Sequence, residues 1–368
     1  MSASQVTDEF DFHPRKTATL VGHAAAEAEL KRAFESGRMP HAWLLAGPRG
    51  IGKATLAYRF ARAVLATDGA GQDSLFGGGG GPSLGSVDAE HPVFRRVAAQ
   101  AHPDLCIVET GVNAKTDKPR EEILVEEARA AATFFSHTSA EGGWRVAIID
   151  AADELNTAAA NALLKIIEEP PPRGLILLIA HRPGFVLPTI RSRARMLRLK
   201  PLPPSEVTTV LRQQWPELQA DDLRALMTMS EGSPGRAIAL AEADGVGFYK
   251  DLQNWAAKLP AMDVAGMHRI ADRLAKRDVG RGFRVLAALP EWWLTRAIRT
   301  LAGHPPASEV VDGEIEVFGR VLGRRNLEHW VGVWEKVSHL LAQGIALNLD
   351  RKQLALTVLS ALGRAARV

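Results

Sequence analysis

The chain has 368 residues, 46% of them hydrophobic, and a formal net charge of +3 at pH 7. This length exceeds what one ordinary hydrophobic core needs, so we expect two or three domains. No apolar run reaches the roughly 18 residues of a membrane span, and the first residues are acidic and polar. Neither a membrane anchor nor a signal peptide is expected, and the cytoplasm is the default location.

The cysteine count excludes further classes of protein. A single cysteine, Cys106, rules out internal disulfides and zinc clusters that need several thiolates at short spacing. Cys106 lies in an apolar run and is expected to be an ordinary core residue. The small net charge implies that any contact with nucleic acid comes from a local patch and not from the whole surface.

Residues 41–200 alternate short apolar segments with amphipathic stretches of helical length, which is typical of a parallel sheet covered by helices on both faces. One of these helices is capped by Asn156 and has to stop at the run Pro170 to Pro172. Residues 68–87 include five consecutive glycines and are predicted to form a mobile surface loop. The five predicted strands are Ala42–Ala46, Leu105–Glu109, Arg145–Asp150, Leu175–Ala180 and Arg195–Leu199.

The remainder of the chain, from Pro201 on, carries no strand pattern and is predicted to be helical. Pro203 and Pro204 indicate a linker, and Ser205 is the expected N-cap of a first helix. Breaks near residues 244–247 separate a small helical domain from a larger bundle. The apolar content of this bundle is high enough for a hydrophobic core of its own. Its tryptophans are expected to be packing residues; they include Trp255, Trp292, Trp293, Trp330 and Trp334.

A glycine-rich segment follows the first predicted strand directly and leads into a predicted helix at 56–65. Its sequence is Gly47-Pro48-Arg49-Gly50-Ile51-Gly52-Lys53-Ala54-Thr55. Glycines at these positions let backbone N–H groups turn toward phosphate oxygens at a helix N-terminus, and the lysine reaches the terminal phosphates. The alternative is a glycine-rich turn with a solvated lysine. The candidate phosphate-binding residues are Gly47, Gly50, Gly52, Lys53, Ala54 and Thr55.

Two positions of this site lack the groups that hydrolysis needs. A Ser or Thr hydroxyl should follow the lysine and bind magnesium, but the residue is Ala54. Thr55 is no easy substitute, because one helical step turns a side chain by about 100°. Asp150 ends the third strand, where an acid can help to hold magnesium, but Ala151 occupies the next position, at which an AAA+ ATPase carries the glutamate that orients water.

The two losses predict negligible ATP turnover, because removing one well-placed catalytic group commonly costs 100-fold or more in rate, on the order of a few kcal/mol. Nucleotide binding without hydrolysis stays open, since the backbone loop and Lys53 are retained. Asp153 and Glu154 follow the strand and are expected to be acids on a solvated face at the start of a helix, not replacements for the missing base.

Several blocks of this sequence resemble those of bacterial clamp-loader subunits, which are AAA+ proteins. The altered ATP site makes the chain resemble the delta-prime type of subunit and not the motor type. The resemblance covers residues 13 to about 240, and beyond them it depends mainly on the segment that starts at Asn348. The blocks are His41-Ala42-Trp43-Leu44-Leu45, the phosphate loop, Gly142-Gly143-Trp144-Arg145, Asn161-Ala162-Leu163-Leu164-Lys165, Glu168-Glu169-Pro170-Pro171 and Pro188-Thr189-Ile190-Arg191-Ser192-Arg193.

The resemblance implies an α/β AAA+ P-loop domain over residues 1–200, a helical lid over 201–245 and an all-helical collar over 246–368. Through the collar, five subunits associate into a ring that opens the circular polymerase clamp and closes it around primed DNA. The implied partners are the tau/gamma ATPase subunits and the delta subunit, together with the clamp and DNA reached through the ring; no membrane is involved. No cofactor is required, although ATP or ADP bound without hydrolysis remains open. Zinc is not expected, because the glycine-rich loop stands where many members carry a four-cysteine module.

The resemblance also implies a role for one arginine. In this family the arginine of a Ser-Arg-Cys motif enters the ATP site of the adjacent motor subunit, and the matching residue is Arg193, followed by Ala194 in place of the cysteine. A forked, permanently charged guanidinium suits the stabilisation of a phosphoryl group across an interface. The alternative is a solvated basic edge formed by Arg191, Arg193, Arg195 and Arg198.

Other positions depart from the ATPase pattern. Gly235 stands where ATPase relatives have a phosphate-sensing arginine, and Arg236 comes one place later. Ala180 and His181 replace a polar threonine pair at the tip of the fourth strand, and His181 is expected to have no catalytic task. These changes favour a non-hydrolysing subunit. Two further functions stay open: a working AAA+ ATPase and a nucleotide-sensing switch.

Overall fold

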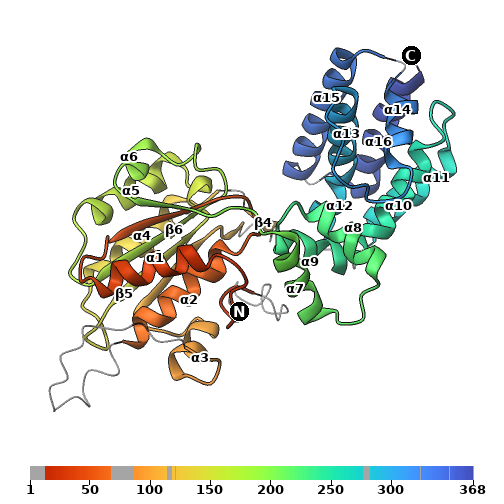
Figure 1. The fold of residues 1–368 in the computed structure, drawn as a ribbon. Coiled ribbons are helices and arrows are strands. Elements are labelled where there is room, and N and C mark those ends of the chain that lie inside the picture. The colour runs from red at the N-terminus through yellow and green to blue at the C-terminus, as the bar shows by residue number, and fades with distance from the viewer. Residues whose placement is uncertain are drawn as a thin grey trace. The chain divides into compact units, whose positions relative to one another are not determined.

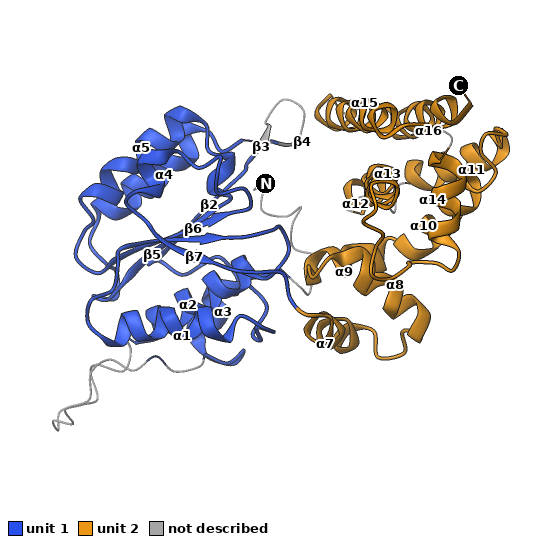
Figure 2. Cartoon of the chain, turned by 45° about the horizontal axis from the view of Figure 1, so that its top comes forward, with its two compact units in different colours: residues 1–202 blue, residues 203–368 orange. Residues whose placement is uncertain are grey.

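The computed structural model of the chain describes residues 13–67, 84, 87–113, 118–120, 122–276, 282–323, 325–347 and 349–367. The predicted glycine-rich loop at 68–87 lies outside them except for Leu84 and Val87. The chain divides into two compact units, Met1–Leu202 and Pro203–Val368 (Figure 2). The further division of the second unit into a lid and a collar stays a prediction.

The first unit contains a five-stranded parallel sheet with the strand order β2-β5-β6-β1-β7. All five predicted strands are present, and only two ends differ: β6 begins one residue earlier and β7 ends one residue earlier than expected. The α/β class with five parallel strands is confirmed. The bounds are β1 (Ala42–Ala46), β2 (Leu105–Glu109), β5 (Arg145–Asp150), β6 (Gly174–Ala180) and β7 (Arg195–Arg198).

A two-stranded antiparallel hairpin, β3 (Val112–Asn113) and β4 (Lys118–Pro119), was not predicted from the sequence. Strands of two residues are too short to show the alternation of apolar and polar residues by which a strand is recognised.

Helices cover both faces of the sheet, as Figures 1 and 2 show. In β1, Trp43 and Leu45 belong to the apolar cluster on one face, whereas Ala42 and Leu44 belong to the cluster on the other. Such alternation follows from the two-residue period of a strand, and a strand buried on both faces is therefore apolar throughout. One face packs α1 (Ala24–Glu35), α2 (Lys53–Ala66) and α3 (Pro92–Ala98), and the other packs α4 (Val125–Ser136) and α5 (Thr157–Glu168).

Helix α5 begins and ends where the sequence indicates. The Asn156 side chain accepts a hydrogen bond from the Ala159 N–H at 2.8 Å, which satisfies a donor that has no partner within the helix. The helix ends at Glu168, two residues before Pro170. The short helix α6 (Pro188–Arg191) follows β6 and leads into β7. The predicted arginine, Arg193, lies in the turn between α6 and β7.

The second unit is helical throughout its described residues. Its first helix has Pro203 as N-cap and Pro204 as its first residue, so the prediction of Ser205 as N-cap is wrong. The fixed φ angle of proline suits the first helical position, and Ser205 therefore falls inside the first turn. The helices are α7 (Pro204–Gln214), α8 (Ala220–Ser230), α9 (Pro234–Glu242), α10 (Gly245–Ala256), α11 (Val264–Ala275), α12 (Phe283–Ala287), α13 (Leu289–Leu301), α14 (Glu314–Leu322), α15 (Leu327–Ala346) and α16 (Arg351–Arg367).

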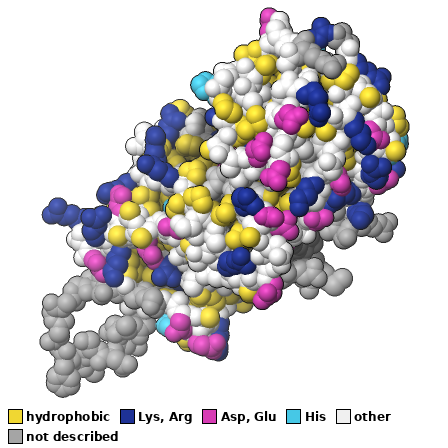
Figure 3. Space-filling view, turned by 45° about the vertical axis from the view of Figure 1, so that its right-hand side comes forward, with side chains coloured by type: hydrophobic (Ala, Val, Ile, Leu, Met, Phe, Trp, Pro, Cys, Tyr) yellow, Lys and Arg dark blue, Asp and Glu magenta, His cyan; other side chains and the backbone are white. Residues whose placement is uncertain are grey.

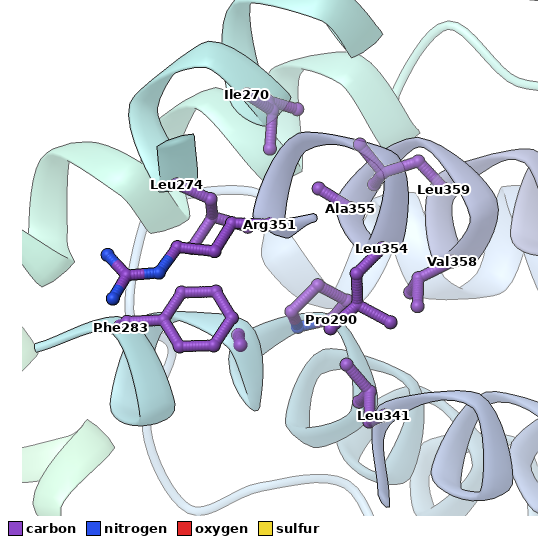
Figure 4. A pocket seen from close by; sticks show the side chains of 11 residues that line it. Ile270, Leu274, Phe283, Pro290, Leu341, Arg351, Leu354, Ala355, Val358 and Leu359 are labelled. Carbon is purple, nitrogen blue, oxygen red and sulfur yellow. The ribbon is translucent and has the colours of Figure 1, made fainter. Parts of the chain in front are cut away.

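Four of the five tryptophans predicted to be packing residues lie in the interior of the second unit, with Trp255, Trp292, Trp293 and Trp330 at most 8% exposed. Trp334 is half-buried, and its indole donates to Thr295 Oγ1 at 3.0 Å. The Trp293 indole donates to Gln253 Oε1 at 2.6 Å, and the Trp330 indole donates to the carbonyl of Leu322 at 3.0 Å. These bonds satisfy the N–H groups of the two buried indoles. A small apolar pocket lies near the start of α16, where the Arg351 guanidinium is 4.6 Å from the centre of the Phe283 ring (Figure 4).

A buried ionic cluster connects α10, α13 and α14. Glu314 is fully buried and accepts hydrogen bonds from Arg296 Nε at 3.0 Å and Nη2 at 2.6 Å, from the Val310 N–H at 3.0 Å, and from the Tyr249 hydroxyl. Burial, together with the Glu314 charge, raises the pKa of Tyr249 well above its ordinary value, so the phenol stays a donor. A buried carboxylate is tolerated here because its oxygens are satisfied on several sides.

A second polar cluster joins the predicted lid to the predicted collar within this unit. Glu231, which follows α8, accepts from the Trp292 indole of α13 at 3.0 Å and from Arg236 of α9 at 3.1 Å. The Arg236 guanidinium also lies 5.5 Å from the centre of the Trp292 ring. These contacts lie within the single compact unit that residues 203–368 form. Within the described residues, no helix is both long enough and apolar enough to cross a membrane.

Candidate functional site

The glycine-rich segment lies where the sequence predicts it, between the carboxyl end of β1 and the start of α2. Gly47 has to be a glycine, since a Cβ atom there would lie 2.4 Å from the carbonyl oxygen of Leu199. Gly52 precedes α2 with φ at +104°, and Gly50 has φ at +77°, conformations that other residues rarely adopt. The backbone therefore has the form of a phosphate-binding loop at a helix N-terminus.

Lys53 is the first residue of α2 and only 3% exposed. Its Nζ donates hydrogen bonds to the carbonyl oxygens of Gly47, at 2.7 Å, and Pro48, at 2.5 Å. Burial lowers the pKa of Lys53 to about 8, and the Arg49 charge contributes to this, while Asp150 and Asp153 act in the opposite direction. The ammonium thus binds the carbonyls of its own loop, and a phosphate would have to compete with them.

The two residues after the lysine supply no visible magnesium ligand. Ala54 packs against the apolar cluster that α1 and α2 form with the sheet, and its side chain carries no oxygen. Thr55 is half-buried in the first turn of α2. Among the described residues, no group of three His, Cys, Asp or Glu side chains is arranged to hold a metal ion. The expectations about magnesium and zinc stay predictions.

Asp150 ends β5 and lies opposite Glu109 of β2 in the sheet register. Burial raises the pKa of Asp150 to about 6, with the Glu109 charge acting in the same direction and the Lys53 and Arg49 charges acting against it. Because the charges of Lys53 and Asp150 each shift the pKa of the other, the acid at the end of β5 and the lysine of the loop belong to one site. Ala151, which follows, adds no acid or base to it.

Asp153 differs from its prediction. It lies in the short 3-10 helix η2 (Ala152–Glu154), is 8% exposed, and accepts the backbone N–H groups of His181 and Arg182, both at 2.9 Å. Although burial alone would raise its pKa, these two hydrogen bonds hold the pKa of Asp153 below its ordinary value. The interpretation as an acid on a solvated face is therefore wrong for Asp153, whose role is to fix the end of β6. Its partners lie 28 and 29 residues away in sequence, so no local pattern indicates them.

His181 lies directly after β6, near the phosphate loop. Burial lowers its pKa to about 4, and the Lys53 and Arg49 charges contribute. Its imidazole is consequently neutral at pH 7. Its lack of a catalytic task stays a prediction.

Replacing Asp150 by Asn should make the stability of the chain depend less on pH between about 4 and 7. The folded-state pKa of about 6 exceeds the ordinary 3.8, so the folded chain binds the proton more tightly, and stability is lost as pH rises through this window. From pH 4 to pH 7, the free energy of unfolding of Asp150→Asn should therefore rise by about 2 kcal/mol relative to that of the wild type, since one pKa unit corresponds to about 1.4 kcal/mol. Urea unfolding at the two pH values measures this gain, and a difference that is the same at both would contradict it.

Arg193 lies on the surface in the turn between α6 and β7. Its Nη2 forms an ion pair with Glu168 Oε1 at 2.9 Å, and its Nη1 donates to the Thr189 carbonyl at 3.1 Å and to Ser192 Oγ at 3.3 Å. The side chain is 42% exposed. These contacts hold Arg193 against the ends of α5 and α6.

The neighbouring arginines have separate partners. Arg191 donates to the Pro183 carbonyl at 3.3 Å, and Arg195 pairs with Glu29 at 2.8 Å and lies 4.9 Å from the centre of the Trp43 ring. Arg198 is exposed and contacts Met196 Sδ at 3.3 Å. On the face shown in Figure 3, Lys and Arg side chains are interspersed with Asp and Glu. The role of Arg193 on a neighbouring subunit stays a prediction.

Comparison with known proteins decides the family. A family model described as "DNA polymerase III, delta subunit" matches residues 22–203. DNA polymerase III subunit delta' of Escherichia coli (strain K12) is 30% identical over 342 residues, which cover 89% of this chain and 90% of that protein. The chain belongs to the DNA polymerase III delta' subunit family.

Two further relatives match about half of the chain. DNA polymerase III subunit delta' of Pseudomonas aeruginosa is 34% identical over 195 residues, 53% of each chain, so the match spans about half the length of that relative. DNA polymerase III subunit gamma/tau of Mycobacterium tuberculosis (strain H37Rv) is 31% identical over 201 residues, covering 54% of this chain and 31% of that protein. A gamma subunit-related protein from Thermotoga maritima of known structure is 15% identical, covers 93% of this chain and 99% of that chain, and superposes with a TM-score of 0.43.

Proposed function

We propose that the chain is a non-hydrolysing structural subunit of a bacterial clamp loader that helps to load the sliding clamp onto primed DNA. Its partners in this proposal are the gamma/tau ATPase subunits and the delta subunit, and it works in the cytoplasm. The observation that supports the proposal most strongly is the pairing of a retained phosphate loop with Ala54 and Ala151, where hydrolysis needs a hydroxyl and a carboxylate.

In this proposal, the subunit's own nucleotide site does not hydrolyse ATP. Backbone N–H groups of the loop can bind phosphate oxygens, so ATP or ADP can be held, but no side chain at position 54 or 151 binds magnesium or orients water. The Lys53 ammonium is already hydrogen bonded to Gly47 and Pro48. We propose that any nucleotide bound here stays intact.

The contribution to catalysis would come from Arg193, which we propose enters the ATP site of a neighbouring ATPase subunit. Charge builds up on the phosphoryl oxygens during transfer, and a guanidinium placed beside them lowers the barrier. Arg193 is suited to this task because it is exposed, permanently charged and located on the surface turn before β7.

Assembly is the first test of this function. The purified chain, mixed at micromolar concentration with the gamma/tau and delta subunits of its own organism, should co-elute with both in size-exclusion chromatography coupled to light scattering. A matched mixture that lacks the chain serves as control. Elution of the chain as a separate peak under conditions in which the other subunits associate would contradict the proposal.

A further inference from the structure

The contacts of Arg193 point to a residue that controls its orientation. Glu168, the last residue of α5, pairs with Nη2 at 2.9 Å, while the Thr189 carbonyl and Ser192 Oγ both accept from Nη1. The contacts involve both terminal nitrogens and so fix the direction of the guanidinium plane. Nε takes no part in these contacts, so the group keeps donor capacity for phosphate oxygens from outside.

Glu168 is firmly anchored at its backbone. The preceding residue, Ile167, is 1% exposed, and its carbonyl is hydrogen bonded to His41 Nε2 at 2.6 Å. His41 directly precedes β1, the strand that leads into the phosphate loop. On the other side, Pro170 prevents the helix from continuing. The carboxylate therefore projects from a point tied to the sheet.

We infer that Glu168 is a positioning residue, which holds Arg193 in the orientation needed to enter the neighbouring ATP site; the inference rests on the proposed function. A free arginine side chain samples many rotamers, and ordering it at the interface lowers the rate of productive encounters. A contact that restricts these rotamers before docking removes part of that cost. Because the pair is solvent-exposed, the expected gain is modest, about three- to fivefold.

The test compares two neighbouring glutamates in the assembled complex. Glu168→Gln keeps the size of the side chain and removes its charge, and Glu169→Gln makes the same change at an exposed position one residue later. We expect Glu168→Gln to lower kcat for ATP hydrolysis by about three- to fivefold with KM for ATP little changed, and Glu169→Gln to have no effect. The difference between wild type and Glu168→Gln should shrink as salt is raised, because exposed ion pairs are screened.

A double-variant cycle separates positioning from a general structural effect. If Glu168 acts through Arg193, then Glu168→Gln should slow hydrolysis no further once Arg193→Ala is present. An additive slowing would overturn the inference, and so would a faster rate in Glu168→Gln alone, since that would mean that the pair restrains the arginine. If Arg193→Ala slows hydrolysis but Glu168→Gln does not, the positioning role fails and the proposed function stands. If neither variant slows it, the role of Arg193 in the proposed function fails as well.

Discussion

Arg193→Ala should slow ATP hydrolysis at the site next to this subunit by about 1,000-fold in the assembled complex. An arginine that reaches across an interface to the transferring phosphoryl group contributes on this scale, because it stabilises charge that develops on the phosphoryl oxygens only in the transition state. Single-turnover hydrolysis measures the effect: part of the bound ATP should be hydrolysed in a new, slow phase. The complex should still assemble, since the side chain is exposed and its removal leaves no buried charge.

Two further substitutions serve as controls for this result. Arg191→Ala removes a neighbouring exposed guanidinium that donates to the Pro183 carbonyl, and it should leave the rate within about twofold of wild type. Arg193→Lys keeps the charge but loses the fork of donors, and it should restore only part of the rate. Hydrolysis kinetics of Arg193→Ala that match those of wild type in all phases would rule out action on the neighbour.

Glu314→Ala should lower the free energy of unfolding by about 3–5 kcal/mol. The carboxylate is fully buried, and removing it leaves the Arg296 charge with no counter-ion in the interior and the Tyr249 hydroxyl without an acceptor. Urea unfolding followed by tryptophan fluorescence is a suitable measurement, because several tryptophans of this unit are buried.

The control for this change lies on the same helix. Glu316 is exposed, and Glu316→Ala should change the free energy of unfolding by no more than about 0.5 kcal/mol. Combining Glu314→Ala with Arg296→Met should recover part of the lost stability, because the unpaired charge is then removed too. Equal unfolding midpoints for the Glu314 and Glu316 variants would show that the buried cluster contributes nothing.

The sequence predicts the sheet well because its strands are buried on both faces. A continuous apolar run as short as Ala42–Ala46, followed at once by a glycine-rich turn, fits a buried strand far better than a helix, and all five strands lie within one residue of their predicted bounds. The phosphate loop is predictable for a similar reason, since its glycines, its lysine and the adjoining helix are contiguous in the chain. The helix end at Glu168 is also local, set by the prolines after it.

The sequence fails where partners meet only in three dimensions. Asp153 has the pattern of a solvated acid, but the end of β6 brings two N–H groups to it. The pairing of Glu168 with Arg193 joins residues 25 positions apart, on elements whose proximity depends on the packing of α5 and α6. In the same way, the contact between Glu231 and Trp292 connects two predicted domains, and periodicity along the chain does not indicate it.

In the proposed function, this subunit's own phosphate loop does not hydrolyse ATP, and its Arg193 acts in the ATP site of another subunit. ATP turnover should therefore be measured for the purified chain alone, for the gamma/tau subunits with delta, and for the full mixture. We predict no magnesium-dependent turnover by the chain alone, and an increase on mixing that Arg193→Ala abolishes. Steady ATP hydrolysis by the isolated, contaminant-free chain, or an equal increase with Arg193→Ala, would contradict the account.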